Sequence, residues 1–330
     1  MKRLPLCVGV LLLSGAVFGQ TAVPILNIIV GASHLPLWLA VDHGLFEKQG
    51  LRPLVTVVDS AELDRRLGID APLAVVGAAA AIAATASGHP MKMLMPLNNA
   101  ATTSMLMARR GVDSVSAMKG KRLAVARVGT GFWLTAMLAL QHLGVDSTRD
   151  EIRFVEVGDL PAIVAALRAG AADAAVVDAA QGRELKTEGF ATLLDMGAEK
   201  IIGVPSVLAA SADYVARDEV TVERVVQALI EGIAFGLAPR NRDIAVQTLA
   251  GRMGLANRAT ADIAYHTFAT TVVQKPYLAR TTIENMLRVM AINDPRVSSL
   301  RADDLIDDRF VRRLDERGIL TNIFRQYAVQ

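Results

Sequence analysis

The sequence has almost no cysteine. Cys7 is the only one in 330 residues, which excludes an intrachain disulfide and a zinc or iron–sulfur site held by cysteines. Histidine is scarce too: none of the five lies in an HExxH pattern or another close pair, which argues against a local metal motif. With 35 lysines and arginines against 33 aspartates and glutamates, the basic excess of a nucleic-acid-binding protein is missing. We therefore expect no metal, no cofactor and no nucleic-acid partner.

An apolar stretch lies close to the N-terminus. Lys2 and Arg3 precede the apolar stretch Leu4–Val17, and small residues follow it. This order is typical of a secretory signal peptide, so we predict that residues 1–19 are cleaved and that the protein is periplasmic. A membrane anchor is the alternative, but a span needs about 20 apolar residues, and this stretch is shorter and contains Pro5.

Short apolar segments alternate with helical patterns up to about Ser211, and only helical patterns follow. Such alternation favours parallel strands with helices on both faces. We predict an α/β fold with two similar units, each a mostly parallel sheet flanked by helices, and a helical C-terminal tail. Because no flexible linker separates the units, we expect a hinge of crossing strands. The predicted strands are Ile25–Val30, Arg52–Val57, Leu73–Val76, Met91–Pro96, Arg122–Arg127, Ile152–Val157, Ala174–Val177, Thr192–Leu194 and Val207–Ala210.

Several motifs recur in a defined order along the first 200 residues. They are His34–Ala40 (HLPLWLA), Gly44–Leu51 (GLFEKQGL), Ser116–Val125 (SAMKGKRLAV), Ala165–Gly170 (AALRAG) and Asp173–Asp178 (DAAVVD). Together they resemble the periplasmic substrate-binding proteins of ABC importers. The branch in question handles nitrate, sulfonates, taurine, bicarbonate and thiamine-precursor pyrimidines, and includes the NMT1/THI5-like and SsuA/TauA-like proteins. One departure is Leu67–Pro72, where the family usually has a shorter step before the third strand.

The resemblance implies a periplasmic binding protein type II topology. The first lobe would comprise 24–106 plus 207–330, and the second lobe 107–206. It also implies that a ligand draws the lobes together and that the loaded protein, a monomer, docks on an ABC transporter permease at the membrane.

Candidate ligand-binding residues follow from a general rule of parallel sheets. Ligands bind beyond the carboxyl ends of the strands, so the residues that follow each predicted strand are the candidates. These residues are Ser33, His34, Gly77, Asn98, Asn99, Gly129, Thr130, Gly131, Phe132 and Asp178.

Thr130 lies between two glycines at the start of a predicted helix. The free N–H groups of such a helix favour an anion, although a threonine here can equally serve as the helix cap. Either Phe132 or Trp133 can stack on a ligand, and core packing is the alternative for both. Arg127 can clamp an anion or remain a surface residue.

Asp178 ends a very apolar strand, so its carboxylate must be wet, paired or facing a ligand. A carboxylate in the cleft favours a ligand with an amine, hydroxyl or protonated ring over bare nitrate or bicarbonate. His34 can bond an oxyanion or be a structural histidine. Asn98 and Asn99 can bind ligand or cap a helix, and Asp159 is better explained as a helix cap.

Enzyme functions find little support. A partial dinucleotide fingerprint at Gly129 and Gly131 lacks its third glycine, because Leu134 stands there, and no GxSxG elbow occurs. Relatives that synthesise the thiamine pyrimidine carry a cysteine-rich motif, which is missing here. We therefore predict a non-enzymatic solute-binding protein for a small anionic or zwitterionic nutrient, sulfonate/taurine-like or pyrimidine-like. The alternatives are a ligand-sensing receptor and an enzyme on the same fold.

Overall fold

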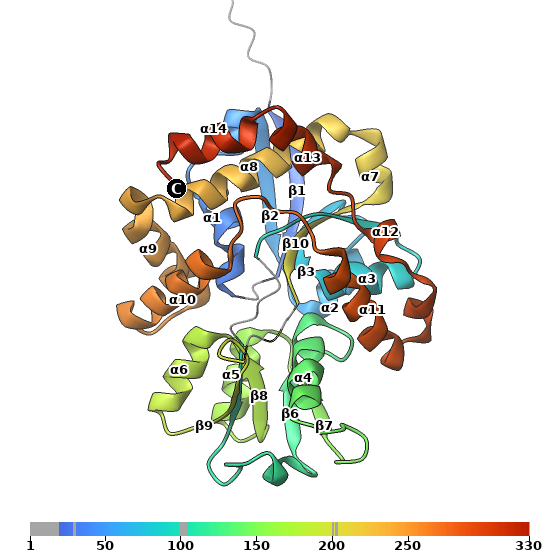
Figure 1. Cartoon of the computed structure of the whole chain (residues 1–330), viewed down its shortest axis with the longest axis vertical. Coiled ribbons are helices and arrows are strands. Elements are labelled where there is room, and N and C mark those ends of the chain that lie inside the picture. The colour runs from blue at the N-terminus through green and yellow to red at the C-terminus, as the bar shows by residue number, and fades with distance from the viewer. Residues whose placement is uncertain (1–19, 29–30, 99–103, 200, 202–203, 330) are drawn as a thin grey trace, which may run out of the picture.

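The computed structural model describes residues 20–28, 31–98, 104–199, 201 and 204–329. The chain forms two five-stranded sheets, in the orders β2-β1-β3-β10-β4 and β7-β6-β8-β5-β9, and Figure 1 shows them as two halves. The prediction of two helix-flanked sheets with a helical C-terminal region is confirmed. The strands are β1 (Thr21–Asn27), β2 (Leu51–Val57), β3 (Leu73–Gly77), β4 (Met91–Pro96), β5 (Met105–Ala108), β6 (Arg122–Val125), β7 (Arg153–Glu156), β8 (Ala174–Val177), β9 (Ala191–Asp195) and β10 (Ser206–Ser211).

Each sheet contains one strand that runs antiparallel to both of its neighbours. In the first sheet this strand is β10, between β3 and β4, and in the second it is β5, between β8 and β9. The other pairs are parallel, so four of the five strands in each sheet point the same way, and the sheets are mostly parallel as predicted, with one reversed strand each. The reversed strands follow the two crossings of the chain between the halves, from Pro96 to Met105 and from Asp195 to Ser206. A strand that arrives from the opposite half starts where its neighbours end, which forces the reversal.

The helices cover both faces of the sheets, and the C-terminal ones gather around the first half (Figure 1). No helix in the described part of the chain is long and apolar enough to cross a membrane. The helices are α1 (Leu35–Asp42), α2 (Ser60–Arg66), α3 (Ala78–Ala86), α4 (Gly131–His142), α5 (Leu160–Arg168), α6 (Ala179–Thr187), α7 (Ala212–Arg217), α8 (Glu219–Leu237), α9 (Arg242–Met253), α10 (Arg258–Thr271), α11 (Arg280–Asn293), α12 (Ala302–Leu305), α13 (Arg309–Glu316) and α14 (Ile319–Gln326).

The boundaries of the two lobes stay a prediction. The strands of the first sheet end at Pro96 and resume at Ser206, whereas all strands of the second lie between Met105 and Asp195. The predicted signal peptide, 1–19, lies outside the described residues.

Helix α8 packs directly on helix α1 in the core of the first half. The contact depends on Gly232, because a Cβ added there would lie 2.3 Å from the carbonyl oxygen of Pro36. Both helices are apolar where they meet: Leu35, Leu39 and Ile233 are fully buried. The missing side chain therefore lets two helix backbones approach more closely than any larger residue permits.

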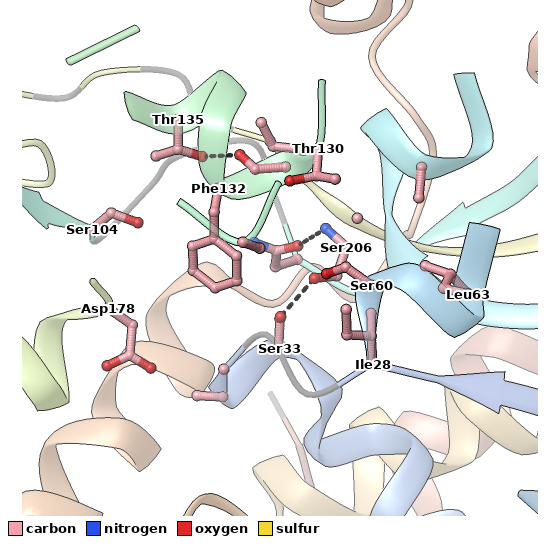
Figure 2. A pocket seen from close by; sticks show the side chains of 18 of the residues that line it. Ile28, Ser33, Ser60, Leu63, Ser104, Thr130, Phe132, Thr135, Asp178 and Ser206 are labelled. Atoms are coloured by element: carbon pink, nitrogen blue, oxygen red, sulfur yellow. Dashed lines mark hydrogen bonds between the residues drawn. The ribbon is translucent and has the colours of Figure 1, made fainter. Parts of the chain in front are cut away.

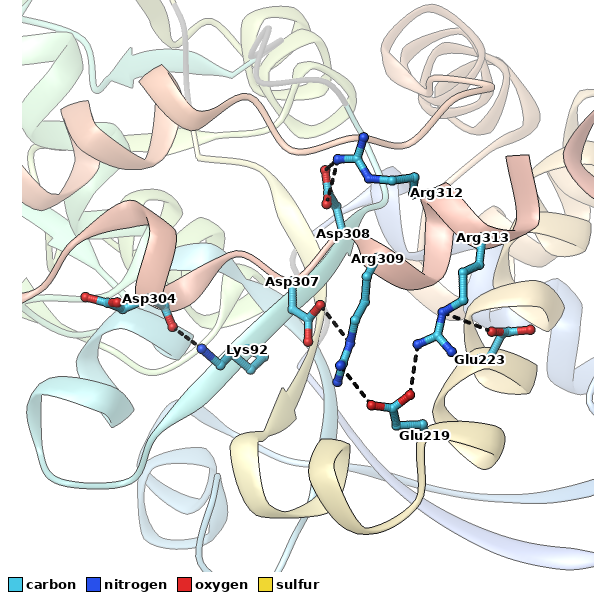
Figure 3. Close-up of polar contacts among 9 residues, drawn as sticks. All are labelled: Lys92, Glu219, Glu223, Asp304, Asp307, Asp308, Arg309, Arg312 and Arg313. Atoms are coloured by element: carbon cyan, nitrogen blue, oxygen red, sulfur yellow. Dashed lines mark hydrogen bonds and ion pairs between the residues drawn. The ribbon is translucent and has the colours of Figure 1, made fainter. Parts of the chain in front are cut away.

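The C-terminal region is attached to the edge of the first sheet. Met93 in β4 forms an isolated parallel bridge with Ile306. Beyond this bridge, Figure 3 shows Arg309 and Arg313 of α13 converging on Glu219 at the start of α8, with N–O distances of 2.8 and 3.0 Å. The bridge and the ion pairs hold the last helices against both β4 and α8.

Candidate functional site

A pocket lies between the two halves of the molecule, where the carboxyl ends of both sheets meet (Figure 2). Its volume is about 130 Å³, and its described walls come from both sheets, from α2 and from the C-terminal helix α10. The lining consists mainly of small and hydroxyl-bearing residues. They are Ile28, Gly31, Ala32, Ser33, Ser60, Leu63, Asp64, Gly77, Ala80, Asn98, Ser104, Ala126, Thr130, Gly131, Phe132, Thr135, Asp178, Val204, Ser206, Thr267 and Thr271.

Seven of the ten predicted residues line this pocket: Ser33, Gly77, Asn98, Thr130, Gly131, Phe132 and Asp178. The structure does not bring His34 or Gly129 to its described lining, and Asn99 lies outside the described residues. Whether the seven bind a ligand stays a prediction.

The reversed strands explain why two further residues, Ser206 and Ser104, line the pocket. Ser206 begins β10 opposite Gly77, the last residue of β3, and Ser104 directly precedes β5. The Ser206 hydroxyl lies 2.8 Å from that of Ser33, and its backbone N–H donates to Oδ1 of Asn98 at 2.8 Å. These bonds fix one polar wall. A rule that inspects only strand ends misses both serines, because on a reversed strand the first residue reaches the ligand edge.

The N-terminus of α4 forms another wall. The Thr130 hydroxyl does not cap the helix; it donates to the carbonyl oxygen of Arg127 at 2.6 Å. With no side-chain cap, the first N–H groups of α4 retain donor capacity at Gly131 and Phe132, which both line the pocket. The positive end of the helix dipole lies at the same N–H groups, so this wall suits an acceptor or anionic group.

The two neighbouring aromatic residues of α4 point in different directions. The Phe132 ring lies in the pocket (Figure 2), whereas Trp133 is buried and meets Phe154 edge-on, with ring centroids 6.3 Å apart. Phe132 is therefore the one of the pair that a ligand can stack on.

Asp178 contributes a carboxylate at the start of α6. Its Oδ1 accepts the backbone N–H groups of Ala180 and Gln181 at 2.9 and 3.1 Å, so it caps the helix. Gly31, from the other half, approaches so closely that a Cβ there would lie 3.1 Å from Oδ2. Burial raises the pKa of Asp178 to about 6, against the opposing effect of the two N–H donors. The side-chain amide of Gln181 also faces this carboxylate, which belongs to the described pocket lining.

His34 lies outside the described pocket lining, and its predicted ligand contact stays a prediction. It is fully buried, and its Nδ1 lies 2.7 Å from Oδ1 of Asn27. Its Nε2 has no partner among the described residues, and burial lowers the pKa of the imidazole to about 3. Gly129 is a turn residue: its φ of 86° is needed for the tight turn in which the N–H of Thr130 bonds Arg127.

Helix α2 supplies residues that the sequence analysis did not identify. Ser60 and Asp64 line the pocket, and both also reach the second half. The Ser60 hydroxyl donates to the carbonyl oxygen of Gly158 at 2.9 Å, and Asp64 pairs with Arg127. Burial raises the pKa of Asp64 more than Arg127 lowers it. Neither residue follows a strand, and a serine and an aspartate in a short polar helix give no signal of their own. Asp159, as predicted, caps α5 by accepting the N–H of Ala162.

The described side chains include no group of three or more histidine, cysteine, aspartate and glutamate residues that could hold a metal ion. The described pocket lining offers hydroxyl groups, apolar side chains and the carboxylates of Asp64 and Asp178.

Solved structures with this arrangement are numerous. The nitrate-binding protein NrtA from Synechocystis PCC 6803 is 15% identical, with a TM-score of 0.73 over 92% of this chain and 91% of its own. The alkanesulfonate-binding protein SsuA from Xanthomonas axonopodis pv. citri, bound to MOPS, is 20% identical, with a TM-score of 0.68 over 86% and 95%. A variant of DszB in complex with biphenyl-2-sulfinic acid is 15% identical, with a TM-score of 0.66 over 89% and 99%. These likenesses show the fold of periplasmic binding proteins.

At the level of sequence, no curated protein matches this chain significantly. The family profile described as NMT1/THI5 like matches residues 31–241, a segment that begins at Gly31 beside Asp178 and runs through both sheets. This segment contains most of the described pocket lining and covers well over half of the chain. The chain therefore belongs to the NMT1/THI5-like family and has the fold of the substrate-binding proteins of ABC importers.

Proposed function

We propose that this protein is the extracytoplasmic solute-binding component of an ABC importer. It would capture one small organic molecule between its two halves and deliver it to a membrane permease, as a monomer and without catalysis. Residues 1–19 would direct it out of the cytoplasm. The family membership, the fold and a pocket walled by both halves support this role.

The class of ligand follows from a difference between two walls of the pocket, one of which offers an acceptor and the other donors. Asp178 offers a carboxylate from α6, while the uncapped N-terminus of α4 offers N–H groups around Thr130 (Figure 2). A ligand with an amine or hydroxyl at one end and an acceptor or anionic group at the other satisfies both walls. This favours a zwitterionic or amine-bearing solute, such as an aminoalkanesulfonate or an aminopyrimidine, over nitrate or bicarbonate.

The size of the pocket narrows the class further. A cavity of about 130 Å³ is close to the roughly 150 Å³ that accommodates a benzene molecule in a protein core. The solute is therefore a single ring or a short chain, with Phe132 against its apolar part.

Binding would proceed by closure of the two halves around the solute. The contacts of Ser60 with Gly158 and of Asp64 with Arg127 already join the halves. A ligand that touches both halves adds to these contacts, and so shifts the population toward the closed form.

The first test is a thermal-shift screen of the chain from residue 20 onward. The panel contains taurine, alkanesulfonates, nitrate, bicarbonate, thiamine and its pyrimidine. A ligand at 100 times its dissociation constant stabilises the folded state by about 2.7 kcal/mol, which such a screen detects easily. Stabilisation by amine-bearing members supports the proposal, and stabilisation by nitrate or bicarbonate alone contradicts the ligand class.

The second test concerns Asp178. Asp178→Asn is expected to weaken binding of an amine-bearing ligand about 100-fold, because a charge-assisted hydrogen bond in the cleft is lost. Since the pKa of Asp178 is raised to about 6, wild-type affinity for a cation should fall by up to tenfold per pH unit below 6. Isothermal titration calorimetry at pH 5, 6, 7 and 8 measures both effects.

Asparagine is a good helix cap, so the stability of Asp178→Asn should change little. The matched control is Asp159→Asn, which alters another capping aspartate outside the described pocket lining and should leave affinity unchanged. Equal affinity in the wild type and Asp178→Asn, or equal losses in the two variants, would remove Asp178 from the site.

A further inference from the structure

The charges around the pocket are unbalanced. Two carboxylates, Asp64 and Asp178, belong to the described lining, and none of the lysines, arginines and histidines of the described chain does. Arg127 lies just outside: it follows Ala126, which lines the pocket, at the carboxyl end of β6. Its guanidinium is the cation that an entering anion would meet at this edge.

Asp64 forms an ion pair with this guanidinium. Oδ2 of Asp64 pairs with Nη2 of Arg127 across the two halves, and the side chains are 32% and 38% exposed. Nε of Arg127 is buried and has no partner among the described residues, so the guanidinium retains a donor that the pair does not use. The charge of Arg127 is thus neutralised by Asp64, and an anion that approaches Arg127 also meets the negative charge of Asp64.

Helix α2 has a second contact with the other half of the molecule. The hydroxyl of Ser60, one turn earlier in the same helix, already ties α2 to the second half through Gly158 at 2.9 Å. Asp64 therefore shares the contact between α2 and the second half with Ser60, and it also places a negative charge in the pocket wall.

We propose that Asp64 is a specificity-determining residue that keeps simple anions out of the pocket by pairing with Arg127. Without its charge, Arg127 and the N-terminus of α4 would together form a site for a sulfonate, carboxylate or nitrate group. With it, only a ligand that also brings a donor or a positive charge enters favourably. Discrimination of this kind comes from a repulsive group placed against the wrong ligand. The inference rests on the proposed solute-binding function of the same pocket.

The test is the substitution Asp64→Asn, which keeps the shape of the side chain and removes its charge. Titration calorimetry with propanesulfonate and with nitrate, at low salt, should show at least about tenfold tighter binding to Asp64→Asn than to the wild type, because a like charge near the anion is gone. The double variant Asp64→Asn with Arg127→Gln should lose that gain. Binding of a zwitterion such as taurine by the wild type is measured in parallel.

Glu62→Gln is the matched control. It removes one negative charge from the same helix, but Glu62 pairs with Arg66 and does not belong to the described pocket lining, so anion affinity should stay at the wild-type level. Circular dichroism verifies that each variant is folded, and Asp64→Ser replaces Asp64→Asn if the latter is not.

The two proposals fail in different ways. If folded Asp64→Asn gains no anion affinity, or if Glu62→Gln gains as much, the role of Asp64 is overturned, whatever the wild type binds. If the wild type binds no member of the amine-bearing panel while Asp64→Asn binds anions, the role of Asp64 stands and the proposed ligand class fails.

Discussion

Replacing Gly232 by alanine is expected to destabilise the protein by about 3 kcal/mol or more, which is at the upper end for a single methyl group. The added Cβ would lie 2.3 Å from the carbonyl oxygen and 3.0 Å from the carbonyl carbon of Pro36. Both are backbone atoms, so no rotamer change relieves the clash, and α8 must move away from α1. Urea denaturation followed by circular dichroism measures the loss.

Gly251 provides the matched control. It also lies inside a helix, α9, but a Cβ there meets nothing within 4 Å. Gly251→Ala should therefore stabilise the protein by about 0.5–1 kcal/mol, because alanine is the better helix former. A Gly232→Ala protein as stable as the wild type would mean that α1 and α8 do not pack as closely as described.

Acid is expected to destabilise the protein through His34. Nδ1 of His34 bonds Asn27, so a second proton would have to enter at Nε2, which is buried and has no partner among the described residues. The pKa of His34 is therefore lowered from 6.5 to about 3 in the folded state. Between these values the unfolded chain binds more protons, so the stabilising effect is complete above about pH 6.5 and declines as the pH falls, by about 1.4 kcal/mol per pH unit.

The comparison with His34→Gln isolates this effect. Asp178, whose pKa is raised to about 6, acts in the opposite direction: its contribution to stability is complete below the ordinary aspartate pKa and is lost as the pH rises through 6. This contribution is common to both proteins and cancels in their difference. Urea titrations at pH 7, 6, 5 and 4 should show the advantage of the wild type shrinking with each step. A difference that stays constant with pH would disprove the assignment.

Much of the fold was predictable from the sequence. Strands β4 and β8 have the predicted bounds, Met91–Pro96 and Ala174–Val177, because both are short, mainly apolar segments between clear breaks. The sequence does not predict strand β5, since Met105–Ala108 is only four residues long and contains no β-branched residue. Helix α1 ends at Asp42, because the chain turns at Gly44 with a φ of 66°.

The site was predictable where it depends on local position and unpredictable where it depends on distant packing. Thr130 and Asp178 follow strands of the second sheet, so the general rule locates them. Thr267 and Thr271 reach the pocket from α10, far along the chain, and no local pattern announces this. The full burial of His34 likewise depends on tertiary packing and cannot be read from its place in the sequence.

The position of β10 also sets the order in which the molecule can be assembled. Strands β3 and β4 pair with β10 and not with each other, so the first sheet stays in two pieces until residues 206–211 arrive. All strands of the second sheet lie before residue 196, so that half can complete its hydrogen bonds earlier during synthesis. The wall formed by Ser33, Asn98 and Ser206 is likewise complete only when β10 is present. A truncated chain that lacks β10 lacks Ser206, and with it the hydrogen bonds that join Ser33 and Asn98 in one wall of the pocket.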